Sequence, residues 1–185
     1  AVLRAGYTCV NVNPLYTARE LEHQLKDSGA TAIVILENFA HTLAEVIDHT
    51  AVQHVVIASM GDLLGAWYGR WITFAVRHLA KMVPAYELPL TGGRQVISFK
   101  RALALGERRT LTPARVAPDT PAFLQYTGGT TGLSKGAVLT QRNIVAATLQ
   151  AEAWFTPALG KIGDLSRANS IAALPLYHIF ALTLC

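Results

Sequence analysis

The 185-residue sequence predicts an α/β fold built on parallel strands, and two observations lead to that fold class. First, apolar runs of strand length, such as Ala32–Leu36, alternate at short spacing with segments of helical period. Such runs are typical of strands covered on both faces, and the alternation is typical of a parallel sheet. Second, a glycine- and threonine-rich stretch at residues 126–136 follows another apolar run, as expected for a phosphate-binding loop.

The first third of the chain predicts three strands and two helices. The helix at 18–28 has the clearest boundaries, because Thr17 and Glu20 occupy the two positions of a capping box and Gly29 follows the last turn. The predicted order is a strand at 10–13, this helix, a strand at 32–36, a helix at 41–50 and a strand at 53–59.

The segment from 61 to 84 predicts an amphipathic helix with aromatic residues on one face. The apolar arc comprises Leu64, Trp67, Tyr68, Trp71, Ala75, Leu79 and Met82, and the opposite side carries Arg70, Arg77 and Lys81. A helix docked on its own sheet explains this pattern and is the favoured interpretation. The alternative is an interfacial helix, because tryptophans beside basic residues suit a layer of lipid headgroups.

The second half predicts a strand edge and a short helix within 96–105, then a basic, proline-rich linker at 106–118. A strand at 122–126 leads into the glycine-rich loop, and a strand at 136–139 returns from it. Thr140 is expected to cap a helix that runs to about Trp154. A polar connection at 160–169 and a strand at 171–174, which stops at Pro175, complete the order.

The loop at 126–136 contains four glycines, several hydroxyl groups and Lys135. Glycines allow positive φ and close approach to a ligand, successive N–H groups form an anion site, and the lysine adds a positive charge. The alternative is a hairpin turn, but this loop is longer and richer in glycine than a turn requires. It matches neither the Walker motif nor the dinucleotide fingerprint. A nucleoside triphosphate is the predicted ligand.

Composition and cysteine content restrict the class of protein. The net charge of +4 suits an anionic ligand but is too small and scattered to indicate nucleic acid. Two cysteines at opposite ends predict a reducing compartment, the cytoplasm, and exclude a disulfide scaffold. Neither a signal peptide nor an 18-residue apolar span is visible in the sequence.

Three segments together resemble the adenylate-forming (AMP-binding) ligase superfamily. The first is Tyr126–Gly136, the second runs from Arg4 to Ala30 and includes Val10-Asn11-Val12-Asn13-Pro14-Leu15-Tyr16, and the third is Leu174-Pro175-Leu176-Tyr177-His178-Ile179-Phe180. The match is most similar to bacterial long-chain fatty acyl-CoA synthetases. The resemblance implies that residues 1–185 are an incomplete fragment of the large N-terminal, AMP-binding domain, and that the C-terminal domain is absent.

The resemblance also implies an activity: activation of a long-chain fatty acid with ATP and Mg²⁺, then transfer of the acyl group to coenzyme A. The implied ATP-binding residues are Thr127, Gly128, Gly129, Thr130, Thr131, Gly132, Ser134, Lys135 and Gly136, and either Thr130 or Thr131 is the hydroxyl near Mg²⁺. His178 is the implied catalytic-site residue, where it shapes the site rather than acting as a base, because a carboxylate is already ionised at pH 7. Tyr177, His178 and Phe180 are the implied wall of the acyl pocket.

Two other functions stay open at this level. An aryl- or amino-acid-activating domain belongs to the same superfamily, and a non-catalytic nucleotide-binding or membrane-docking module belongs to another class. The expected partners are a fatty acid, the cytoplasmic face of a membrane and a second copy of the chain, because a truncated sheet leaves an unpaired edge. The fragment alone is expected to be inactive, and the sequence does not specify the acyl chain length.

Overall fold

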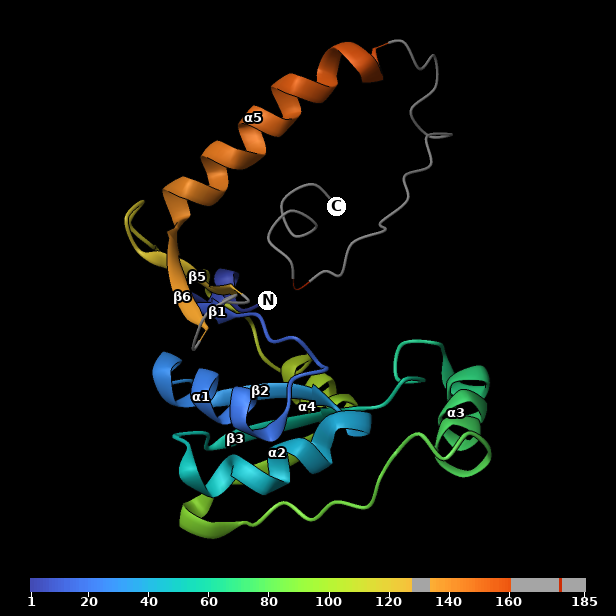
Figure 1. The fold of residues 1–185 in the computed structure, drawn as a ribbon. Helices are drawn as coiled ribbons and strands as arrows, with labels where there is room; N and C mark the ends of the chain where they lie inside the picture. The colour runs from blue at the N-terminus through green and yellow to red at the C-terminus, as the bar shows by residue number, and fades with distance from the viewer. Residues whose placement is uncertain (128–133, 161–176, 178–185) are drawn as a thin grey trace. The chain divides into compact units, whose positions relative to one another are not determined.

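The computed structural model describes residues 1–127, 134–160 and Tyr177 (Figure 1). The chain divides into two units: Ala1–Asn13 with Thr112–Cys185 form unit 1, and Pro14–Leu111 form unit 2. Unit 2 is therefore one continuous segment inserted in sequence between the first strand of unit 1 and the rest of that unit.

Unit 2 contains a parallel sheet in the order β2-β3-β4, formed by Ala32–Leu36, His54–Ala58 and Gln95–Ser98. Ile33 is aligned with Val55, and Val55 with Val96, so equivalent side chains point to the same face. The strand at 32–36 is confirmed at both ends, and β3 differs from its predicted range by one residue at each end.

Helix α1 (Ala18–Ser28) confirms the predicted boundaries and their cause. The N–H of Thr17 donates to Glu20 Oε2 at 2.8 Å, and the N–H of Glu20 donates to Thr17 Oγ1 at 3.4 Å, which completes the capping box. Gly29 has φ +62°, a left-handed conformation that ends the helix. The helix predicted at 41–50 is instead η2 (Glu37–Phe39), α2 (Ala40–Val46) and η3 (Ile47–His49).

The core of unit 2 lies between α1, α2 and one face of the sheet. Its fully buried side chains include Leu25, Leu43, Ile47 and Val55. Helix α4 (Phe99–Gly106) lies on the opposite face, behind the strands in Figure 1, and packs against β3 and β4. The prediction that the strand at 32–36 is covered on both sides is wrong. Helix α4 covers β3 and β4, and Val34 of β2 is 64% exposed.

The helix predicted at 61–84 is shorter and faces the other way. It consists of α3 (Ala66–Phe74) and a π-helical turn, η4 (Ala75–Leu79). The favoured prediction, that the aromatic face docks on the sheet, is wrong: Trp67 is 85% exposed and Trp71 is 57% exposed, whereas Gly69 is buried. The side of the helix that carries Gly69 packs closely on the turn at Gly61, and the tryptophans point outward.

Unit 1 contains the sheet β1-β5-β6, formed by Cys9–Val10, Pro121–Thr127 and Lys135–Thr140. Strand β1 runs parallel to β5, with Cys9 aligned to Phe123, while β5 and β6 are antiparallel. The first strand, predicted at 10–13 in one parallel sheet with the strands at 32–36 and 53–59, is therefore shorter and belongs to a different sheet. The hydrogen bonds of β1 go to a strand more than a hundred residues later, which sequence order does not reveal.

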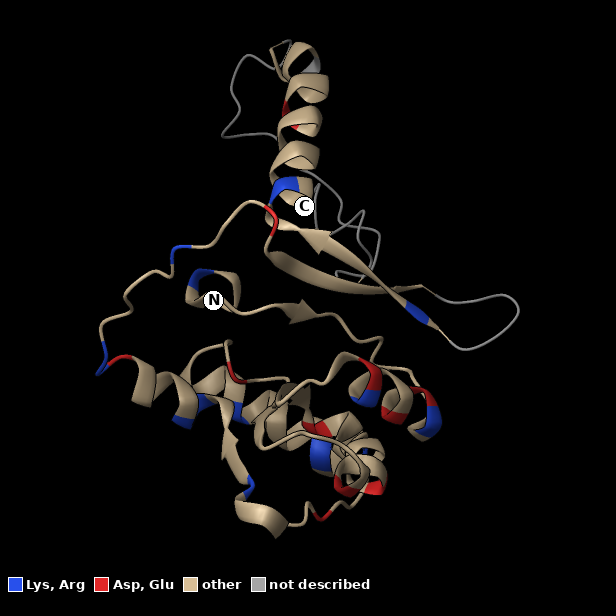
Figure 2. Ribbon diagram, turned by 90° about the vertical axis from the view of Figure 1, so that its left-hand side faces the viewer, with Lys and Arg blue, Asp and Glu red and all other residues tan. Residues whose placement is uncertain are grey.

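Helix α5 (Gln141–Leu159) extends beyond the predicted end at Trp154 and includes Pro157 in its last turn. Figure 2 shows α5 as almost uncharged, with its basic residue in the first turn. Across residues 1–127 and 134–160, none of the helices combines the length and apolar character needed to cross a membrane. The predicted elements at 160–169 and 171–174 lie outside the described residues, apart from Gly160.

Candidate functional site

The glycine-rich stretch is the loop of a β-hairpin. Thr127 of β5 is aligned with Lys135 of β6, and these two residues are the last paired positions before the loop. The loop itself, residues 128–133, lies outside the described residues, and so do five predicted ATP-binding residues: Gly128, Gly129, Thr130, Thr131 and Gly132. The other four, Thr127, Ser134, Lys135 and Gly136, lie together at the base of the loop.

A side-chain hydrogen bond closes the base of this loop. Ser134 Oγ donates to the carbonyl oxygen of Thr127 at 2.7 Å, across the two chains of the hairpin. The hydroxyl proton of Ser134 is therefore directed at the backbone in this structure. Its observed role is to hold the two ends of the loop together.

Lys135 supplies a positive charge beside the loop. Its side chain is exposed, and none of the ion pairs in the described part of the chain includes it. An exposed ammonium without a carboxylate partner can bind a phosphate group without first breaking a salt bridge.

Gly136 has a packing requirement that does not depend on a ligand. It lies directly opposite Tyr126, which is 7% exposed. A Cβ atom at position 136 would lie 2.9 Å from Cζ of Tyr126. The tyrosine ring covers the glycine, so the absence of a side chain at Gly136 lets β5 and β6 pair at this register.

Substituting Gly136 with valine is expected to destabilise unit 1 by about 1–3 kcal/mol, because the buried ring must move. Urea denaturation monitored by circular dichroism measures this change. In a Tyr126→Leu background the same substitution should cost less, because the ring is absent. Ala137→Val, at an exposed position of β6, is the control and should change stability by no more than about 0.5 kcal/mol. Equal costs in both backgrounds would contradict the packing explanation.

Gln125 connects the hairpin to the second predicted motif. Its Nε2 donates to the carbonyl oxygen of Tyr177 at 3.1 Å, which places Tyr177 beside β5 although the two residues are far apart in sequence. Gln125 Oε1 is buried and has no hydrogen-bond partner in the described part of the chain. Of the predicted pocket residues, Tyr177 is thus located at the hairpin, whereas His178 and Phe180 lie outside the described residues.

Sequence reasoning missed Gln125. The available signal was a polar residue inside the otherwise apolar run Ala122–Tyr126, which is unusual because a buried amide needs partners for its polar atoms. The run was interpreted only as a strand that leads into the loop.

Hydrogen bonds at the start of α5 hold the end of the hairpin that lies opposite the loop. The N–H of Thr140 donates to Asn143 Oδ1 at 2.9 Å, and the N–H of Asn143 donates to Thr140 Oγ1 at 3.3 Å, which confirms the predicted cap. The next two amides, of Gln141 and Arg142, donate to carbonyl oxygens in the turn before β5. The first amides of this helix are therefore occupied by the chain itself and are not available to a phosphate.

Cys9 lies on β1, next to β5. Burial raises the pKa of its thiol above the ordinary value of 9.0, and the N-terminal charge opposes this to a smaller extent. The thiol is therefore protonated at neutral pH, and a protonated thiol is a poor nucleophile. The structure therefore does not support covalent catalysis at this cysteine.

Comparison with known proteins gives consistent matches along the whole chain. The family model described as "AMP-binding enzyme" matches residues 1–185. A long-chain-fatty-acid–CoA ligase of Escherichia coli O157:H7 is 52% identical over 183 residues, covering 99% of this chain and 31% of that protein. The corresponding ligase of Haemophilus influenzae is 49% identical, with 98% and 31% covered.

A solved structure shows the same fold. The crystal structure of a long-chain-fatty-acid-CoA ligase from Archaeoglobus fulgidus superimposes with a TM-score of 0.57 at 23% identity, covering 99% of this chain and 28% of that one. The chain thus spans less than a third of the length of each of these three proteins.

Proposed function

Because the chain belongs to the AMP-binding enzyme family, we propose that it carries the ATP-phosphate-binding hairpin of a long-chain fatty acid–CoA ligase. The 52% identity to a bacterial ligase of that specificity supports the substrate class. Since the chain spans 31% of that relative, we assign the complete activity to a protein of the relative's length. Residues 1–185 are then part of its large N-terminal domain.

The observation that carries this proposal is the geometry at the base of the loop. Strand pairing at Thr127 and Lys135, together with the hydrogen bond from Ser134, holds both ends of a glycine- and threonine-rich loop in a fixed position. The ammonium group of Lys135 is exposed at this base. Backbone N–H groups of residues 128–133 and this cation are the donors that a polyphosphate requires.

The proposed reaction has two steps. A fatty acid carboxylate attacks the α-phosphorus of ATP, forming the acyl-adenylate as pyrophosphate leaves. The thiol of coenzyme A then attacks the acyl carbon, and AMP leaves with its electron pair. Negative charge increases on the departing pyrophosphate in the first step, so oriented donors and a cation near the β- and γ-phosphates lower the barrier. The hairpin supplies these groups.

Mg²⁺ would neutralise phosphate charge when bound. The proposed hydroxyl ligand, either Thr130 or Thr131, lies outside the described residues, so no step is assigned through the metal. The described donors fit the nucleotide: an unpaired ammonium at Lys135 suits an anion rather than a cation. We propose that Tyr177, His178 and Phe180 line the pocket for the acyl group, with His178 near the reacting carboxylate.

Exchange of radioactive pyrophosphate into ATP, measured with and without an added carboxylic acid, tests the proposal directly. The exchange reports adenylate formation alone. The full-length protein should show exchange with palmitate and little with coumarate or amino acids. Thioester formation should then require coenzyme A. Exchange that depends on coumarate or an amino acid would overturn the fatty acid assignment, and no exchange with any carboxylate would overturn the ligase assignment. The 185-residue chain alone is expected to show no turnover.

A further inference from the structure

Helix α3 and the turn η4 carry a row of aromatic side chains on their outward face. Trp67, Trp71 and Phe74 follow one another at spacings of four and three residues, which places them on one side of a helix. Their exposed fractions are 85%, 57% and 46%. Exposing this much aromatic surface in one row is costly in water unless another surface covers it.

The side chains of this row form two contact groups along the helix. The guanidinium of Arg70 lies over the ring of Trp67 at 5.8 Å, the rings of Trp71 and Phe74 stack at 5.7 Å, and the ring of His78 lies 4.9 Å from that of Phe74. The prediction that Arg70 lies opposite the aromatic residues is therefore wrong. We term Trp67, Arg70, Trp71, Phe74 and His78 the aromatic strip.

The opposite side of the helix is anchored to unit 2. Gly61 and Gly69 approach so closely that a Cβ atom at position 69 would lie 2.1 Å from the carbonyl oxygen of Gly61. Arg77 Nε donates to Oε2 of buried Glu37 at 2.8 Å, and Asn38 Nδ2 donates to the carbonyl oxygen of Met82 at 3.0 Å. These contacts hold the helix with the aromatic strip directed outward.

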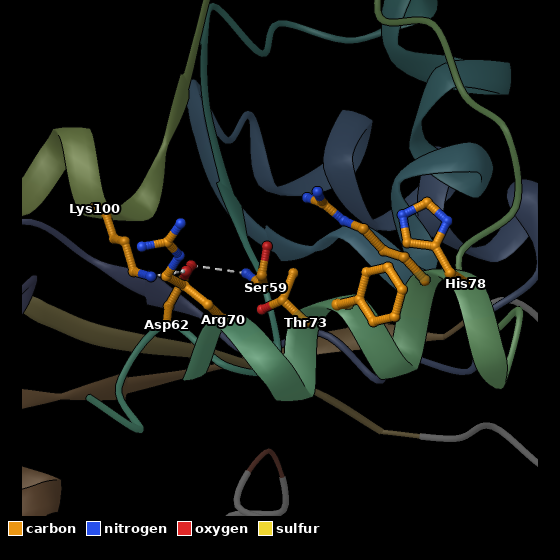
Figure 3. Close-up of a pocket in the computed structure, with 8 residues that line it drawn as sticks. Ser59, Asp62, Arg70, Thr73, His78 and Lys100 are labelled. Atoms are coloured by element: carbon orange, nitrogen blue, oxygen red, sulfur yellow. Dashed lines mark hydrogen bonds and ion pairs between the residues drawn. The ribbon is translucent and has the colours of Figure 1, made fainter. Parts of the chain in front are cut away.

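A hollow of about 360 Å³ lies beside the strip. Figure 3 shows Arg70, Thr73 and His78 facing Ser59, Asp62 and Lys100 around it. Asp62 Oδ1 forms an ion pair with Lys100 Nζ at 3.5 Å, and Arg77 forms an ion pair with Glu37. Arg70 forms no salt bridge with a carboxylate in the described part of the chain, so its positive charge is available to an outside anion.

Charge along this segment has one sign. Residues 63–86 include Arg70, Arg77, Lys81 and His78 and no aspartate or glutamate. A second copy of the chain, docked symmetrically, would bring like charges together. Arg77 is already paired with Glu37. Anionic headgroups would instead meet the charges of Arg70 and Lys81, while the aromatic rings enter the interfacial layer where tryptophan is enriched.

We propose that the aromatic strip is a docking surface for a bilayer containing anionic phospholipid. Trp67, Trp71 and Phe74 lie at the depth of the headgroups and upper acyl chains, and Arg70 with Lys81 binds headgroup phosphates. The helix lies parallel to the membrane plane. This proposal does not depend on the ligase activity, because it rests on the exposure and charge of α3 and η4.

Co-sedimentation of the full-length protein with phosphatidylglycerol/phosphatidylcholine vesicles tests the proposal. The double variant Trp67→Ala/Trp71→Ala and the single variant Arg70→Glu should each weaken vesicle binding about tenfold. Trp154→Ala is the matched aromatic control, because Trp154 is 82% exposed on α5. Arg19→Glu, on the exposed side of α1, is the matched charge control. Both controls should bind like the unmodified protein.

Tryptophan fluorescence provides a second readout. The difference between the emission spectra of the unmodified full-length protein and of a Trp67→Phe/Trp71→Phe variant isolates these two residues. This difference spectrum should shift to shorter wavelength with phosphatidylglycerol vesicles. Neither pure phosphatidylcholine vesicles nor free inorganic phosphate should cause the shift. Emission that is already blue-shifted without vesicles would overturn the proposal, because another part of the protein would then cover the strip. A dimer that dissociates in the double tryptophan variant would overturn it in favour of a second copy.

Discussion

Replacing Lys135 with alanine in the full-length protein is expected to lower fatty-acid-dependent ATP–pyrophosphate exchange by about 10²-fold. The side chain is exposed at the base of the loop, where its charge can follow the pyrophosphate as it leaves. A cation that stabilises charge appearing in the transition state changes kcat more than ground-state binding. The exchange rate should therefore fall more than the apparent affinity for ATP.

Two further variants make this prediction specific. Lys135→Arg keeps the charge but replaces a compact ammonium with a planar group, so it should retain more activity than alanine. Lys26→Ala removes another exposed lysine, which pairs with Glu22 at 2.5 Å on α1, and it should leave exchange unchanged. If Lys135→Ala keeps its rate within about twofold at saturating ATP, this cation does not act on the leaving phosphate.

Replacing Arg94 with leucine is expected to destabilise unit 2 by about 3–5 kcal/mol. Arg94 is 7% exposed and joins three segments of the unit. Its guanidinium donates to the carbonyl oxygens of Ile47 at 3.3 Å, Val52 at 3.1 Å and Pro89 at 2.6 Å. It also donates to Asp48 Oδ1 at 2.9 Å. Leucine offers no donor, so these backbone acceptors lose their partner inside the protein.

Urea denaturation of the full-length protein, followed by circular dichroism, measures this loss. Arg101→Leu, at an exposed position of α4, is the control and should change stability by no more than about 0.5 kcal/mol. Arg94→Lys should fall between the two, because one ammonium cannot reach all the acceptors that the planar guanidinium spans. A cost for Arg94→Leu similar to that of the control would show that the acceptors are satisfied by water.

The interaction between Arg94 and Asp48 also predicts how the stability of unit 2 depends on pH. Hydrogen bonds from Arg94, and then Thr91, hold the pKa of Asp48 below its ordinary value of 3.8. The stabilisation from the ionised carboxylate is therefore complete above about pH 4–5 and is lost as the pH falls through the lowered pKa. The stability difference between the unmodified protein and Asp48→Asn should shrink on acidification below pH 4, and a constant difference would contradict this origin.

Local chemistry explains why parts of the fold could be predicted. Both hydrogen bonds of the capping box join Thr17 and Glu20, which lie within one helical turn. The start of α1 therefore follows from neighbouring residues. Thr140 and Asn143 do the same for α5. The hairpin around the glycine-rich stretch is equally local, because its two strands are separated only by the loop.

The errors concern contacts between distant residues. Strand β1 pairs with β5 rather than β2, and the aromatic face of α3 points outward rather than onto the sheet. Helical period gives the direction of an apolar face relative to its own helix, but not the surface that this face meets. The inward side of this helical segment is held by the hydrogen bond from Arg77 to Glu37, 40 residues earlier in the chain, which the helical pattern does not contain.

The amino-acid sequence by itself determined the class of fold, the caps of α1 and α5, and the hairpin around the glycine- and threonine-rich stretch. Alternating apolar and helical segments indicate the class of fold, and hydrogen bonds between near neighbours specify the caps and the hairpin. Tertiary structure alone decided the partner of β1, the packing of Tyr126 over Gly136, the contact from Gln125 to Tyr177 and the outward face of α3. Each of these depends on which distant groups meet when the chain closes on itself, and a pattern read along one segment contains no information about its partner.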